Sequence, residues 1–259
     1  MQETMLLNYQ FQKSSQASKG CLVFIHGLFG DMNNLGVIAR AFAEDYDILR
    51  LDLRNHGRSF HSPQMNYELM AQDVQAVLKT LNLAKCTVIG HSMGGKTAMK
   101  LADIAPDLIE QLIVIDIAPI AYPLNRHNTF FAGLFAVKAA GSTSRQAAKE
   151  VMAEHITDEG VQQFMLKAFD PESPDRFRFN LSGLKDQYAH LMDWQPVKVE
   201  LPTLFIKGAL SDYIQEKDTA SILAQFPQAK SFVVSNADHW VHAEKPDAVV
   251  RAIQRVLTP

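Results

Sequence analysis

Residues 86–94 of the chain read Cys-Thr-Val-Ile-Gly-His-Ser-Met-Gly. The first four form an apolar run typical of a buried strand, and the stretch from Lys96 to Leu101 has the pattern of a helix. A Gly-x-Ser-x-Gly pattern between a strand and a helix predicts a sharp turn that holds the serine in a strained conformation. Glycines flank it because side chains there would collide with neighbouring backbone. The pattern therefore predicts an exposed, reactive hydroxyl at Ser92.

Length and composition fit one large α/β domain, with or without an insertion, because 259 residues can bury a substantial core. Apolar residues make up 47% of the chain and charged residues 20%, as in ordinary globular proteins, and the net charge of -3 is small. We therefore expect neither nucleic acid nor a membrane as partner, while the oligomeric state stays open.

The first residues, Met1 to Thr4, lack the basic and apolar regions of a secretory signal, and no later segment runs to about 18 apolar residues. We expect a cytoplasmic, unanchored protein. The two cysteines, Cys21 and Cys86, each open an apolar run, where a small buried side chain is more common than a disulfide or a metal ligand.

Short apolar runs alternate with amphipathic stretches along most of the chain, which indicates parallel strands covered by helices on both faces. A loosely alternating segment, Thr4 to Phe11, is expected to add an antiparallel edge strand. The predicted buried strands are residues 22–25, 48–53, 87–89, 112–117, 203–206 and 232–234. The predicted covering helices are residues 35–43, 67–81, 95–104, 215–225 and 246–257.

This alternation of strand and helix patterns stops between Pro119 and Pro202, where helical patterns continue without a strong apolar strand. We interpret residues 119–201 as a helical cap inserted into a core formed by residues 1–118 and 202–259. The predicted cap helices are residues 127–140, 144–155, 158–168 and 182–194. The cap aromatics are expected to line an acyl pocket or to form the core of the cap.

A serine hydroxyl needs a positioned base, usually a histidine that a carboxylate orients. His239 follows the last predicted strand and precedes the final helix, in the chain order of serine, acid and histidine that this architecture uses. The other eight histidines fall in loops, helical patterns or strand ends. We therefore predict that His239 is the base.

The orienting acid has two candidates. Asp116 ends an otherwise apolar strand, where an unpaired carboxylate would be costly to bury, so a histidine partner would explain it. Asp212 follows a later strand. In this architecture an aspartate commonly lies one residue earlier, at the position that Ser211 occupies here. We favour Asp116 and keep Asp212 as the alternative acid.

An oxyanion intermediate needs two fixed donors. The N–H of Met93, directly after the serine, is one candidate, and that of Leu28 in the loop His26-Gly27-Leu28-Phe29-Gly30 is the other. Phe29 and Trp240 are weak candidates for substrate contact.

Several charged residues are also conspicuous. Arg126 and Lys96 could meet an acidic substrate group, although such cations are usually solvated, and only Arg126 is kept as a weak binding candidate. The polar loop from Asp52 to Ser59 is expected to form internal ion pairs and turns rather than a catalytic site.

On these motifs the chain resembles an α/β-hydrolase over its whole length and, more narrowly, small bacterial carboxylesterases of the YbfF type. The segments that carry the resemblance are residues 24–30, 90–96, 115–119 and 239–246. The resemblance implies an α/β-hydrolase fold, Asp116 as the acid, a serine at position 211, and short-chain acyl esters or acyl thioesters as substrates.

The sequence thus predicts a serine esterase that acts on a small-molecule ester or thioester, with an acyl-enzyme on Ser92 and no metal or organic cofactor. Two alternatives stay open. One is another reaction on this scaffold, such as carbon–carbon bond hydrolysis or cofactor-free peroxidation, and the other is a ligand-binding signalling protein that retains the triad.

Overall fold

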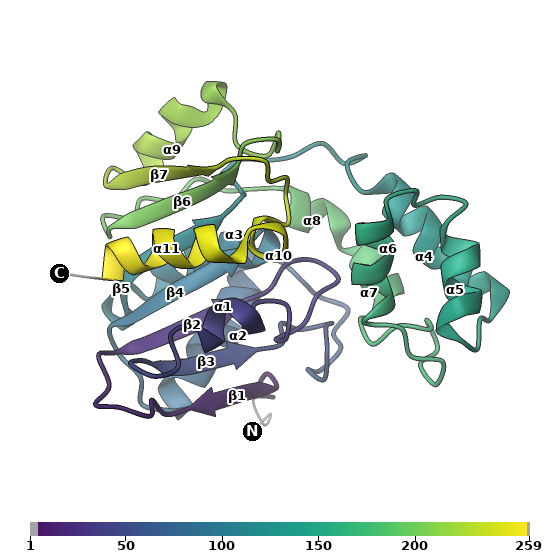
Figure 1. The fold of residues 1–259 in the computed structure, drawn as a ribbon, viewed down its shortest axis with the longest axis horizontal. Helices are drawn as coiled ribbons and strands as arrows, with labels where there is room; N and C mark the ends of the chain where they lie inside the picture. The colour runs from purple at the N-terminus through teal and green to yellow at the C-terminus, as the bar shows by residue number, and fades with distance from the viewer. Residues whose placement is uncertain (1–4, 258–259) are drawn as a thin grey trace.

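A computed structural model describes residues 5–257 and places one twisted sheet at the centre of the molecule (Figure 1). The strand order is β1-β3-β2-β4-β5-β6-β7, with β1 antiparallel to β3 and the other neighbours parallel. This arrangement confirms the predicted fold class. The strands are β1 (Tyr9–Gln12), β2 (Cys21–Ile25), β3 (Asp47–Leu51), β4 (Cys86–His91), β5 (Ile109–Ile115), β6 (Thr203–Gly208) and β7 (Ala229–Val234).

Helices cover both faces of the sheet because the central strands are apolar on both sides. On β2, Val23 packs into the core that α2 and α3 cover, while Phe24 points to the opposite face, which α1 and α11 cover. The helices of this layered core are α1 (Gly36–Arg40), α2 (Tyr67–Thr80), α3 (Met93–Ile104), α9 (Thr219–Gln225), α10 (Val241–Glu244) and α11 (Pro246–Leu257), with short 3-10 turns η1 (Pro106–Leu108) and η2 (Glu216–Asp218).

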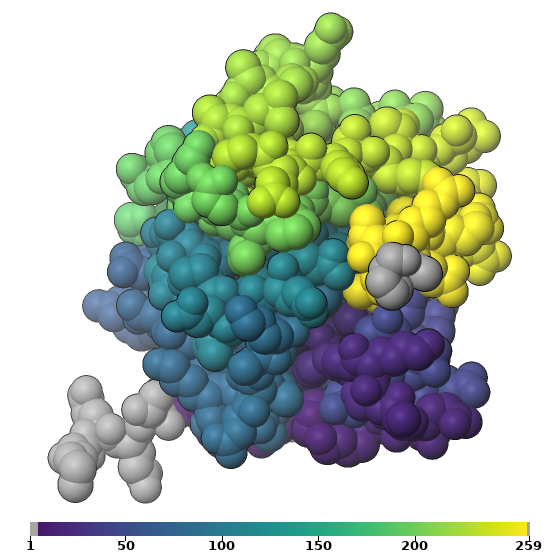
Figure 2. All heavy atoms as spheres, turned by 90° about the vertical axis from the view of Figure 1, so that its left-hand side faces the viewer, coloured from purple at the N-terminus to yellow at the C-terminus, as the bar shows by residue number. Residues whose placement is uncertain are grey.

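Five helices lie between β5 and β6: α4 to α7 form a group at one end of the sheet, and α8 lies between this group and the core (Figure 1). Figure 2 shows the opposite end of the core, where the C-terminal helix lies beside N-terminal segments. The extent of the predicted cap stays a prediction, and residues 1–4 and 258–259 of the predicted core lie outside the described residues. The five helices are α4 (Asn128–Ala140), α5 (Arg145–Met152), α6 (Glu159–Leu166), α7 (Leu181–Asp186) and α8 (Tyr188–Met192).

Some element boundaries differ from the prediction for physical reasons. Strand β3 ends at Leu51, because Asp52 turns away to accept hydrogen bonds from the backbone N–H groups of Met32 (2.8 Å) and Arg58 (3.0 Å). The edge strand begins at Tyr9 rather than at Thr4, which itself lies outside the described residues.

The predicted helix 182–194 is two helices, because Gln187 leaves helical geometry between α7 and α8. Its side-chain oxygen accepts a hydrogen bond from the backbone N–H of Met65 at 3.3 Å, which ties the break to the core.

Candidate active site

Ser92 occupies a tight turn between β4 and α3. Its backbone lies in an unusual region, with φ 55° and ψ -120°. A Cβ on Gly90 would lie 2.2 Å from the carbonyl oxygen of Gly94, and a Cβ on Gly94 would lie 2.3 Å from that of Ile25. Both positions require glycine, because the backbone of the turn lies too close to itself and to β2 to leave space for a Cβ atom.

Three side chains from separate segments form a continuous hydrogen-bonded chain. The Nε2 atom of His239 lies 3.0 Å from the Oγ atom of Ser92, and its Nδ1 atom lies 2.7 Å from Oδ2 of Asp116. Because a carboxylate accepts from Nδ1–H, Nε2 is left to accept the proton of Ser92. The geometry matches a nucleophile, a base and an orienting acid.

Asp116 is fully buried and follows directly after β5, with φ 54°. Besides His239, its carboxylate accepts hydrogen bonds from the N–H of Gly208 (3.0 Å) and the hydroxyl of Ser211 (2.5 Å). Burial raises the pKa of Asp116 to about 6, while these two donors act in the opposite direction. Sequence reasoning did not assign a function to Ser211, and only its place in the resemblance pointed to it.

The other candidate acid, Asp212, points elsewhere. Its side chain is 70% exposed and lies 3.0 Å from Nη1 of Arg126. The guanidinium of Arg126 lies 4.0 Å from the ring centre of Tyr213, and the imidazole of His239 stacks on the same ring at 3.7 Å. Two groups this close to one ring centre must lie on opposite faces, so Tyr213 separates Arg126 from His239. No sequence signal had singled out Tyr213.

The loop after β2 is held by two buried histidines. His26 donates from Nδ1 to the carbonyl of Gly27 (2.7 Å) and accepts from the N–H of Leu53 (3.0 Å), while His56 accepts from the N–H of Phe29 (3.0 Å). Leu28, between these anchors, lines the space around Ser92. Met93 is the first residue of α3, where an N–H has no acceptor inside the helix. The structure thus places Leu28 and Met93, the residues predicted to supply the oxyanion donors, beside Ser92.

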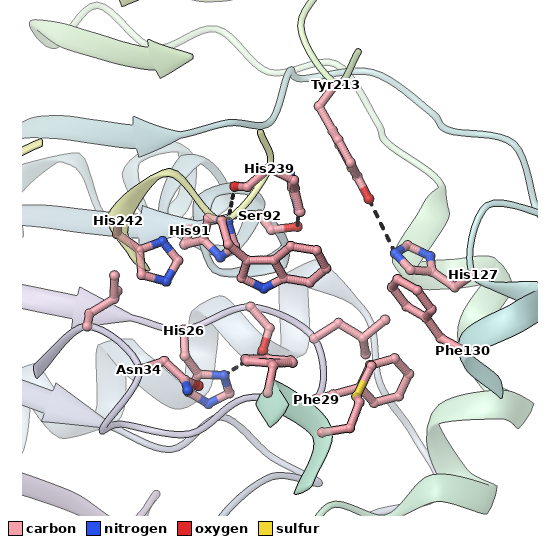
Figure 3. A pocket seen from close by; sticks show the side chains of 16 residues that line it. His26, Phe29, Asn34, His91, Ser92, His127, Phe130, Tyr213, His239 and His242 are labelled. Carbon is pink, nitrogen blue, oxygen red and sulfur yellow. Dashed lines mark hydrogen bonds between the residues drawn. The ribbon is translucent and has the colours of Figure 1, made fainter. Parts of the chain in front are cut away.

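Two cavities meet at Ser92, and we name them after one residue each. The Trp240 cavity is also lined by Phe29 and Phe130 (Figure 3). Phe130 from α4 and Phe164 from α6 pack against the ring of Trp240. The Lys96 cavity lies on the α3 side and contains Met93. Each cavity has a volume of about 30 Å³. Leu28, Ser92, His127 and Tyr213 line both.

One expectation about charged residues was wrong. Lys96 is not solvated, since only 1% of the residue is exposed. Its side chain is buried because it packs against the aromatic rings of Tyr67 and Trp194. The polar loop after β3 forms internal contacts as predicted, including a buried ion pair in which Arg54 Nε lies 2.6 Å from Asp73.

Between residues 5 and 257, no group of three or more potential metal ligands comes together. Within the same span, no helix is both long and apolar enough to cross a membrane.

The chain belongs to the α/β-hydrolase fold family, whose model matches residues 20–246. It is 46% identical to the esterase YbfF of Escherichia coli (strain K12) over 256 residues, which cover 98% of this chain and 99% of that protein. It is 38% identical to the sn-1-specific diacylglycerol lipase ABHD11 of Mus musculus, over 93% of this chain and 82% of that protein.

Among solved structures, one described as a marine microorganism esterase superposes with a TM-score of 0.90 at 31% identity, covering 97% of this chain and 99% of that chain. The predicted resemblance to YbfF-type proteins is confirmed, as is the prediction of an enzyme of the carboxylic ester hydrolase class.

Proposed function

We propose that the protein is a serine esterase that works through an acyl-enzyme on Ser92. The hydrogen-bonded chain from Ser92 through His239 to Asp116, at 3.0 and 2.7 Å, carries this proposal. His239 accepts the serine proton as Ser92 attacks the acyl carbon, and it returns the proton to the leaving alcohol or thiol. Asp116 keeps the imidazole in the required tautomer and stabilises the cation that forms.

The N–H groups of Leu28 and Met93 are proposed to hold the oxyanion, since backbone donors fixed by a loop and a helix start need no reorganisation during the reaction. Water then attacks the acyl-enzyme with His239 as base, which releases the acid and restores the serine. These steps use side chains and backbone of the chain alone.

We infer short-chain acyl esters, and acyl thioesters of similar size, as the substrates. The two cavities at Ser92 are small; the Lys96 cavity is lined mainly by apolar side chains, and the Trp240 cavity by apolar and polar side chains in similar number. The names of the relatives, an esterase and a diacylglycerol lipase, support ester hydrolysis as the reaction type. The cytoplasmic location and the absence of a nucleic acid partner stay predictions.

The test is a pre-steady-state burst of p-nitrophenol from p-nitrophenyl acetate and butyrate, with mass spectrometry of the protein. We expect a burst and an acyl adduct on Ser92. Ser92→Ala should abolish both, whereas Ser231→Ala, on an exposed position of β7, should abolish neither. Turnover that survives Ser92→Ala, or saturable binding without any turnover, would overturn the proposal in favour of other chemistry on this scaffold or a binding protein.

A further inference from the structure

Lys96 is a buried lysine, and no buried anion among residues 5–257 pairs with it. Only 1% of the residue is exposed, and its ammonium makes one long hydrogen bond, 3.4 Å to the carbonyl oxygen of Asp193. Among residues 5–257, that carbonyl is the ammonium's hydrogen-bond acceptor, and Lys96 takes part in none of the ion pairs. An ammonium has three N–H donors, so two are left for another acceptor.

Three aromatic rings surround this ammonium. Its nitrogen lies 5.4 Å from the ring centre of Tyr67, 4.9 Å from that of Tyr122 and 5.7 Å from that of Trp194. The rings stabilise the cation through their π faces but offer it no charge of opposite sign. We call these three rings the aromatic cage, and they surround the Lys96 ammonium without supplying a counterion.

The tyrosine hydroxyls in this cage are already engaged. That of Tyr67 donates to the carbonyl of Leu191 (2.6 Å), and that of Tyr122 donates to the carbonyl of Tyr213 (2.6 Å). Neither is free to donate to a ligand, so the ammonium is the donor that the cage presents. Burial lowers the pKa of Lys96 to about 7, while the charge of the exposed Asp193 carboxylate acts in the opposite direction.

Lys96 also lies beside the nucleophile Ser92. Lys96 and Ser92 line the same cavity and lie four residues apart at the start of α3. Ser92 is the residue before this helix and Lys96 lies in its first turn, and helical side chains tilt toward the N-terminus, where Ser92 lies. A short acyl chain on Ser92 could therefore extend toward the ammonium.

We propose that Lys96 determines acyl specificity, and that the Lys96 cavity receives acyl groups whose far end carries a carboxylate. The preferred substrates are then monoesters or monothioesters of short dicarboxylic acids. This inference rests on the proposed function, because it takes Ser92 as the acylated residue. The substrate carboxylate supplies a buried counterion and accepts hydrogen bonds from the two remaining N–H groups of Lys96.

The experiment compares three methyl esters of equal acyl chain length: methyl butyrate, monomethyl succinate and the neutral amide methyl succinamate. We expect the wild-type kcat/KM for the succinate to exceed that for the succinamate at least tenfold. Lys96→Met should lower this ratio at least tenfold, whereas Lys96→Arg should retain most of it. Lys100→Met removes a charge from the same helix, where Lys100 pairs with Asp103, and should leave the ratio unchanged.

A wild-type ratio at or below one, or an equal ratio in Lys96→Met, would overturn the specificity role. Methyl butyrate separates the two proposals, because failure to hydrolyse any of the three esters contradicts the esterase function itself. If Lys96→Met does not fold, inhibition of butyrate hydrolysis in the wild type by free succinamate, which carries one carboxylate, and by the neutral succinamide decides the question. The proposal requires succinamate to inhibit at least tenfold more strongly, and equal inhibition would overturn it.

Discussion

Asp116 and His239 stand 123 residues apart in the chain, yet Oδ2 of the first lies 2.7 Å from Nδ1 of the second. The contact forms where β5 ends and where the loop after β7 returns over the sheet. Asp116 is fully buried and Asp212 is mostly exposed, so a single strand end provides the imidazole with an acceptor that water cannot reach.

This contact predicts different results for the two candidate acids. Asp116→Asn should lower kcat by roughly 10⁴-fold, because an amide no longer stabilises the imidazolium or enforces the Nδ1–H tautomer. Asp212→Asn should change kcat less than about threefold, because exposed ion pairs contribute little. Steady-state hydrolysis of p-nitrophenyl butyrate measures both. A large loss in Asp212→Asn with a small one in Asp116→Asn would reverse the assignment.

Ser211 is expected to position Asp116 rather than to react. Its hydroxyl donates to the same Oδ2 that His239 contacts, so Ser211→Ala removes one donor and leaves Gly208 and His239 in place. We expect kcat to fall about tenfold with KM nearly constant. Ser211→Thr, which keeps a hydroxyl, should recover part of the loss. An unchanged kcat in the alanine variant would show that Ser211 does not position Asp116 for catalysis.

The pH profile should depend on the charges near His239. Burial and the guanidinium of Arg126 lower the pKa of His239 below its ordinary value of 6.5, while Asp212 raises it. Because the neutral imidazole is the active form, activity is lost as pH falls through this pKa, and the midpoint of the acid limb should lie below 6.5.

Two variants should therefore move the acid limb of kcat/KM in opposite directions. Arg126→Gln should shift it to higher pH, and Asp212→Asn should shift it to lower pH, each by roughly 0.3 units because salt screens partly exposed charges. Shifts of the same sign, or no shift in either variant, would contradict this electrostatic account.

The turn at Ser92 makes a prediction about stability. Gly94→Ala places a Cβ 2.3 Å from the carbonyl oxygen of Ile25 and 2.4 Å from that of His26, so the strand and the turn must separate. We expect a loss of about 3 kcal/mol in the free energy of unfolding, measured by urea denaturation. Gly160→Ala, in α6, meets only the Asp158 side chain at 3.1 Å and should be neutral or slightly stabilising.

Local patterns were sufficient for most of the core. The runs around β2 and β4 are apolar on both faces, so composition alone indicates buried parallel strands. Strand β7 was predicted only from Phe232 onward, because as an edge strand it places the exposed polar residues Lys230 and Ser231 at its start. The break at Gln187 was missed, and the hydrogen bond of its side chain with Met65, 122 residues away, is a contact that local patterns do not show.

The sequence by itself determined the strand, turn and helix around Ser92, since glycines and apolar runs constrain backbone that is close in the chain. It also restricted the base to a residue after the last strand and the acid to two aspartates. Only the tertiary structure places Asp116, and not Asp212, in contact with His239, because burial and a 2.7 Å contact depend on how distant loops meet.

The same dependence explains why sequence reasoning missed Tyr213 and expected Lys96 to be solvated. Tyr213 gains its position from stacking on His239, and Lys96 is buried because Tyr67, Tyr122 and Trp194 converge on it from other segments. A lysine's position in the chain indicates whether it can lie on a helix. Whether its charge is left to water or to a substrate depends on what packs over that helix.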